Sequence, residues 1–114
     1  MSILSRTTIL LAFAASLSGC AATSFHVGHD FDPGIFSANV VRGKTTQEEV
    51  RAWLGAPTST GIRVDPDGTR YNEWTYYKAD GQLSELSETR LKTLEIKFDP
   101  QGVVRGYAWS SSSR

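Results

Sequence analysis

The first twenty residues limit how much of this chain can take part in a folded core. A short start with one positive charge, Arg6, precedes an apolar-to-neutral run from Thr7 to Leu17. A stable membrane-spanning helix needs about twenty apolar residues, whereas a run of this length is typical of the hydrophobic segment of a secretory signal. Removal of residues 1–19 would leave 95 of the 114 residues, enough for one small domain.

The signal-like run ends in a motif that resembles the lipobox of bacterial lipoproteins. Leu17-Ser18-Gly19-Cys20 has an aliphatic residue, two small residues and the single cysteine of the chain. The resemblance implies a lipoprotein signal peptide over 1–19 and acylation of Cys20, and several acyl chains would bind membrane lipid firmly. Ala21 stands where inner-membrane lipoproteins commonly carry aspartate, which implies the periplasmic face of the outer membrane.

Composition excludes several classes of function. Without Arg6, 11 basic residues face 12 acidic ones, and this balance offers no basic excess for nucleic acid. With Cys20 acylated, neither a disulfide nor a catalytic thiol remains. Stability must then come from packing, for which the three Trp and four Tyr are suited.

The segment 44–57 carries the clearest helix signal. Thr45 and Glu48 fit a capping box, and the acidic first turn suits the helix dipole. Apolar side chains recur on one helical face at Val50, Trp53 and Leu54. Gly55-Ala56-Pro57 then stops the helix, which we expect over residues 46–54.

The remaining chain divides around this helix. Residues 20–34 are polar and turn-prone, which predicts a lipidated tether, and 35–41 could form one or two helical turns. The folded domain is expected over 35–110, followed by a flexible tail at 111–114.

Three strands are expected after the helix. Residues 70–78 are rich in aromatics, 93–98 alternate apolar and polar side chains, and 103–109 form the third strand. The polar segment 79–91 is interpreted as a long connection that could carry function.

Two turns share the pattern Asp-Pro-x-Gly, at 65–68 and 99–102. A type I turn followed by a left-handed glycine predicts a three-residue hairpin with a bulge. In the second hairpin Phe98 would face Val104, which places Gly106 and Ala108 toward the core. A shift by one residue would reverse this assignment.

The same register would place three aromatic side chains on the solvated face of the sheet. Tyr77, Tyr107 and Trp109 are therefore candidate partner-binding residues, since exposed aromatics are enriched at interfaces. The alternative is that one of them covers a sheet edge.

Taken together, these motifs resemble the SmpA/OmlA family of BamE-like outer-membrane lipoproteins. The resemblance covers roughly residues 41–107 and is carried by Gly43-Lys44-Thr45-Thr46-Gln47-Glu48-Glu49-Val50, Leu54-Gly55-Ala56-Pro57, Trp74-Thr75-Tyr76, Leu94-Glu95-Ile96-Lys97-Phe98 and Gly102-Val103.

The resemblance implies an α+β fold in which short N-terminal helices pack on a three-stranded antiparallel sheet, as in BamE-like and β-lactamase-inhibitor proteins. It implies a lipid-anchored, periplasm-facing protein-interaction module without cofactor or catalysis. The expected role is an accessory or stabilising component of outer-membrane β-barrel assembly, and the candidate envelope partners are barrel-assembly subunits. No family contact residue matches this chain closely enough to be transferred.

Two alternatives remain. An inhibitor-like or sensor lipoprotein of the same fold would bind another envelope target. A metal-binding or hydrolytic protein would use His26 and His29, next to Asp30 and Asp32, although this segment has many helix breakers and no evident second shell. The aspartates of the 65–68 turn lack the other ligand positions of a calcium loop.

Overall fold

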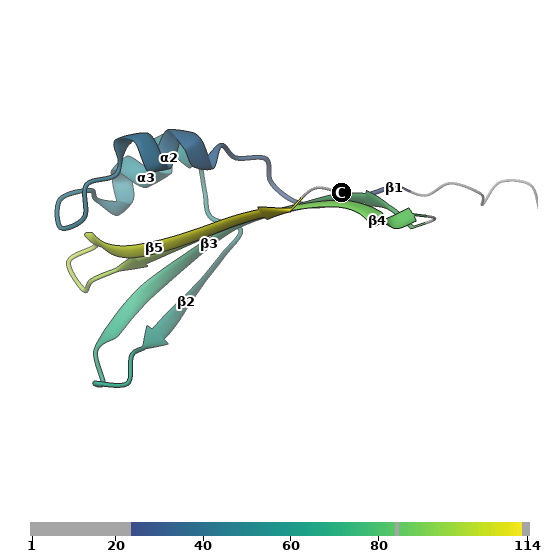
Figure 1. Cartoon of the computed structure of the whole chain (residues 1–114). Coiled ribbons are helices and arrows are strands. Elements are labelled where there is room, and N and C mark those ends of the chain that lie inside the picture. Colours follow the sequence, from purple (N-terminus) through teal and green to yellow (C-terminus); the bar gives the residue numbers. More distant parts are fainter. Residues whose placement is uncertain (1–23, 84, 113–114) are drawn as a thin grey trace, which may run out of the picture.

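A computed structural model describes residues 24–83 and 85–112 as one antiparallel sheet with two helices on one of its faces (Figure 1). This confirms the α+β class and corrects the expected sheet, which has five strands instead of three. A strand also precedes the helices. The elements are β1 (Ser24–Gly28), α2 (Pro33–Asn39), α3 (Gln47–Leu54), β2 (Ser59–Val64), β3 (Arg70–Gln82), β4 (Glu85–Phe98) and β5 (Val104–Ser112).

The sheet is ordered β1-β3-β4-β5, and β2 pairs with β3 on the same edge as β1. β2 pairs with β3 residues 70–75, and β1 pairs with β3 residues 78–82. The hairpin of β3 and β4 therefore extends past the helices as an arm that β1 completes (Figure 1).

The prediction of a long connection at residues 79–91 is wrong. These residues belong to β3 and β4, with Ala79 opposite Leu91 and Asp80 opposite Arg90. Their polar sequence suggested a loop, but two neighbouring strands supply ladder hydrogen bonds to β3 here, and pairing of this kind overrides weak local preference.

The expected tether is also corrected where it is described. Residues 24–28 form β1, and Phe31 is buried in the core at 6% exposure. The Lys92 Nζ lies 2.7 Å from the Asp30 carboxylate and also donates to the Phe31 carbonyl. The segment after β1 is thus fastened to β4. Residues 20–23 lie outside the described part.

The core lies between the helices and the sheet face beneath them. Phe36 of α2 and Val50 of α3 are fully buried. The sheet contributes Trp74, Tyr76, Leu94, Ile96, Phe98 and Val104. The Tyr76 hydroxyl donates to the Gly55 carbonyl at 2.8 Å, so the end of α3 is bonded to the sheet.

Both helices begin at a side-chain cap. The Asp32 carboxylate accepts from the Gly34 amide at 2.8 Å, and Pro33 supplies the first residue of α2. Thr46 caps α3 and accepts from the Glu49 amide at 3.3 Å. The expected capping box at Thr45 was therefore wrong by one residue.

Thr45 has a different role. It is buried, and its hydroxyl accepts from the Val41 amide at 2.8 Å. Its carbonyl accepts from the Val104 amide at 2.9 Å, which joins the loop between the helices to β5.

We expect Phe36→Ala to lower the free energy of unfolding by about 3–5 kcal/mol, because it removes a buried ring from the centre of the core. Ile35→Ala is the matched control, since Ile35 lies on the same helix and is 43% exposed; its effect should be about 0.5 kcal/mol. Urea unfolding measures both. Equal losses would contradict the packing of α2 on the sheet.

Gly28→Ala tests whether β1 belongs to the fold. Gly28 has a φ of +84°, and a methyl group there would lie 1.9 Å from the Tyr77 carbonyl oxygen. The variant should lose more than about 1 kcal/mol. Gly61→Ala in β2 meets nothing within 4 Å and should be close to neutral. A neutral Gly28→Ala in the same unfolding assay would argue that β1 does not pair with β3.

Candidate functional site

The second hairpin turn forms as expected, but the register changes directly after it. The Asp99 amide donates to the Val103 carbonyl at 2.9 Å, and Phe98 pairs with Val104. Lys97 then pairs with Gly106, which leaves Arg105 as an extra residue in β5. A bulge of this kind turns every following side chain to the opposite face.

Two of the three candidate aromatics consequently lie on the helix side of the sheet. Tyr107 is opposite Ile96, and Trp109 is opposite Leu94. The Tyr107 ring packs edge-on against Phe36 with the ring centroids 5.0 Å apart. The expected positions of Gly106 and Ala108 toward the core are therefore wrong.

The third aromatic lies on the other side of the sheet. Tyr77 alternates with the buried Tyr76 on β3 and pairs with Thr93. It is half-buried on the face that the helices leave uncovered, which we call the open face. The structure thus keeps Tyr107 and Trp109 together and separates Tyr77 from them.

Tyr107 and Trp109 lie on β5, the last strand of the sheet. Tyr107 is 40% exposed, and Trp109 is 55% exposed. The start of β5 is covered, because Val104 exchanges backbone hydrogen bonds with Gly43 and Thr45. Beyond Val104, the described chain places no strand against the outer edge of β5.

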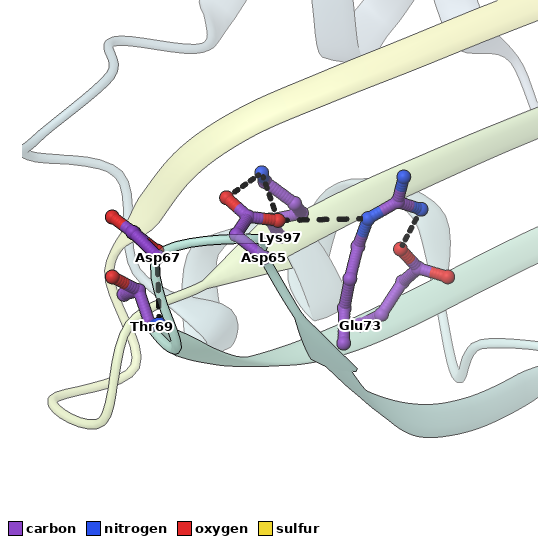
Figure 2. Close-up of polar contacts among 6 residues, drawn as sticks. Asp65, Asp67, Thr69, Glu73 and Lys97 are labelled. Atoms are coloured by element: carbon purple, nitrogen blue, oxygen red, sulfur yellow. Dashed lines mark hydrogen bonds and ion pairs between the residues drawn. The ribbon is translucent and has the colours of Figure 1, made fainter.

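A network of ion pairs crosses the open face from β2 to β4 (Figure 2). The Lys97 Nζ lies 3.2 Å from the Asp65 carboxylate. The Arg63 guanidinium lies 3.1 Å from Glu73 and 3.9 Å from Asp65. The network joins the tip of the β2–β3 hairpin to β4, which it does not neighbour through backbone pairing.

Asp67 points away from this network. Its carboxylate accepts from the Thr69 amide at 2.9 Å, while Asp65 faces Lys97 (Figure 2). The two aspartates of the turn do not converge on a common point, which argues against the calcium-loop interpretation.

A shallow hollow of about 280 Å³ lies beside the network on the open face. It exists because Gly106 and Ala108 bring almost no side chain to this part of β5. Its lining consists of Arg63, Glu73, Glu95, Lys97, Gly106, Tyr107 and Ala108. The lining mixes both signs of charge, so it offers a surface for polar contacts.

His26 takes part in a pair on the arm. Its Nδ1 lies 2.6 Å from the Asp80 carboxylate, and the imidazole is 70% exposed. Within residues 24–83 and 85–112, no group of three or more His, Cys, Asp or Glu side chains is placed to hold a metal. His26 lies on β1 and pairs with Asp80 on β3, whereas His29 lies beyond the end of β1.

Asp99 organises the turn that leads into β5. Its carboxylate accepts from the amides of Gln101 at 2.9 Å and Val103 at 3.0 Å. It also accepts from the Arg105 Nε at 2.7 Å, which holds the bulged residue over the turn. The Val103 amide, with smaller contributions from Arg105 and Gln101, keeps the pKa of Asp99 below its usual value although burial opposes this.

Comparison of the chain with protein-family models, with curated proteins and with solved structures gave no match. Residues 1–19 and Cys20 lie outside the described residues, so the lipid anchor stays a prediction. In the described part, no helix is long and apolar enough to cross a membrane.

Sequence reasoning missed β2 and extended the tail too far. The turn at 65–68 predicts a hairpin, and a hairpin requires a strand before it; Ile62 and Val64 alternate there with Gly61 and Arg63. Ser111 and Ser112, expected in the tail, pair with β4. Residues 113–114 lie outside the described part.

Asp99→Asn should reduce the acid sensitivity of the fold. A carboxyl whose pKa is lowered by folding stabilises the protein above its unfolded pKa of about 3.9, and this contribution is lost as the pH falls through the lowered folded value. The wild-type free energy of unfolding should therefore fall between neutral pH and about pH 2 by more than that of Asp99→Asn. Urea titrations at both pH values measure this, and identical falls would contradict the assigned role of the carboxylate.

Proposed function

We propose that this chain is a lipid-anchored, periplasm-facing protein-interaction module at the outer membrane and a BamE-like accessory component of β-barrel assembly. The observation that carries the proposal is the single cysteine, Cys20, at the end of a lipobox-like motif directly before the folded domain. The motif residues of the resemblance support the family assignment, because the helix around Val50 packs on the strand that carries Trp74 and Tyr76.

The sheet also supports a finer assignment within this proposal. β3, β4 and β5 form an antiparallel meander beneath α2 and α3. We assign this meander to the three-stranded sheet of the BamE-like and β-lactamase-inhibitor fold. β1 and β2 are then additions along the outer edge of β3.

The position of β1 determines how an anchored domain would lie. β1 begins at Ser24, four residues after Cys20, and four residues span at most about 14 Å. The arm would therefore lie close to the lipid headgroups. The helices lie over the other end of the sheet and would project into the periplasm (Figure 1).

Binding rather than catalysis fits the polar groups that are described. The Asp99 carboxylate accepts hydrogen bonds from its own turn, Lys97 pairs with Asp65, and His26 pairs with Asp80. The Lys97 and His26 pairs each fasten one element to another, and Asp99 fastens the turn that leads into β5. Two surfaces are left for a partner protein, the open face around Tyr77 and the exposed aromatics of β5. A partner held at either surface would be bound without a chemical reaction.

An inhibitor-like or sensor role with another envelope target is the second candidate. The uncovered open face favours it, because a solvated sheet face with a mixed-charge hollow can accept a protein loop. The metal-binding alternative has no comparable observation, since His26 pairs with a carboxylate on the arm.

A mild-detergent pull-down tests the proposal. Full-length protein should recover barrel-assembly subunits, identified by mass spectrometry, and Cys20→Ala should recover far less because the domain is no longer held at the membrane. Tyr77→Ala and Trp109→Ala keep the anchor and report which surface makes the contact. Recovery of no assembly subunit, with normal lipidation and expression, would refute the barrel-assembly role and favour the second candidate.

A further inference from the structure

We propose that β5 of one copy pairs antiparallel with β5 of a second copy, centred on Trp109, so that one sheet continues across a twofold-symmetric dimer. This proposal does not rest on the lipid anchor, and a dimer that covers β5 leaves the open face around Tyr77 as the surface for a barrel-assembly partner. It rests on the exposed edge of β5 and on the uncharged sequence of that strand.

The edge of β5 offers backbone hydrogen-bonding groups. β4 pairs with its inner side from Gly106 to Ser112. On its outer side the contacts with the 43–45 loop stop at Val104, and no other strand of the described chain pairs there. An open strand edge of this length is a template for another strand.

The free stretch lacks the features that normally prevent such pairing. Natural edge strands carry lysine, other charges or proline that disfavour association. Residues 106–112 read GYAWSSS and contain none of these, in a chain of which 21% of residues are charged. Trp109 stands at the midpoint of this stretch.

The opposite edge of the sheet is unsuited to the same pairing. It is divided between β2 and β1, whose ladders with β3 end at Thr75 and begin again at Lys78. Arg63 lies in β2, and a charge on the edge would oppose a like charge in a symmetric pair. In the described residues, β5 therefore presents the longest continuous uncharged edge; β1 is also uncharged but has only five residues.

Symmetry favours a second copy as the occupant. A twofold axis brings residues near the centre against themselves, so a charged centre would repel its own copy. Recognition of a different protein commonly uses complementary charge, which 106–112 cannot supply. The neutral strand is complementary to itself, and the two Trp109 rings, each 55% exposed in the single chain, would cover one another.

The mass of full-length protein in mild detergent tests the proposal, measured by light scattering after size exclusion with the detergent contribution subtracted. Wild type should have the mass of two chains. Trp109→Lys and Trp109→Glu should each show half that mass, and a mixture of the two variants should restore the dimer because opposite charges then meet at the axis. Ile62→Lys is the matched control on β2, where Ile62 is 58% exposed; it should remain dimeric.

Folding of each variant is verified by a wild-type circular dichroism spectrum. If Trp109→Lys fails to fold, Ser111→Lys places the charge at an exposed position on the same face of the strand. A monomeric wild type, a dimeric charge variant, no restoration on mixing, or an equal loss in Ile62→Lys would each overturn the assignment.

Discussion

The hydrogen bonds between the loop that joins the two helices and the first residues of β5 hold the layers of this domain together. Val104 donates to Thr45 and accepts from Gly43, and Gln47 donates to Gly102, each at 2.9 Å. Because the loop continues into α3 and follows α2, these bonds set the position of both helices over the sheet. Burial of Phe36 and Val50 then adds the hydrophobic stabilisation that a chain without an internal disulfide requires.

The same corner determines which side chains the last strand displays. Asp99 binds the backbone of its own turn and the side chain of Arg105, and the extra residue at Arg105 turns Tyr107 and Trp109 toward the helices. Without the bulge, glycine and alanine would occupy those positions. The bulge therefore fills part of the space beneath α2 with an aromatic ring and leaves the hollow on the open face.

Local chemistry explains what could be predicted from the sequence. α3, the two Asp-Pro-x-Gly turns and the inward side chains of β4 follow from short-range patterns, and the structure has all of them. β1 depends on pairing between residues far apart in the sequence, such as His26 and Asp80, which are 54 positions apart. This pairing completes the arm of β3 and β4. One bulge determines on which face of the sheet Tyr107 and Trp109 lie, and the turn motif alone did not predict that bulge. For this reason the sequence placed Tyr107 and Trp109 on the wrong face of the sheet. The binding of a partner by the three candidate aromatics stays a prediction.

The way β1 enters the sheet has a mechanical consequence. Ser24 lies at the outer end of the arm, and the five residue pairs of β1 follow from there toward the helices. Tension on the chain before Ser24, directed along the strand, loads these pairs together in shear, whereas tension across the strand would open them one after another. The arm is therefore expected to resist an axial pull far better than a sideways one.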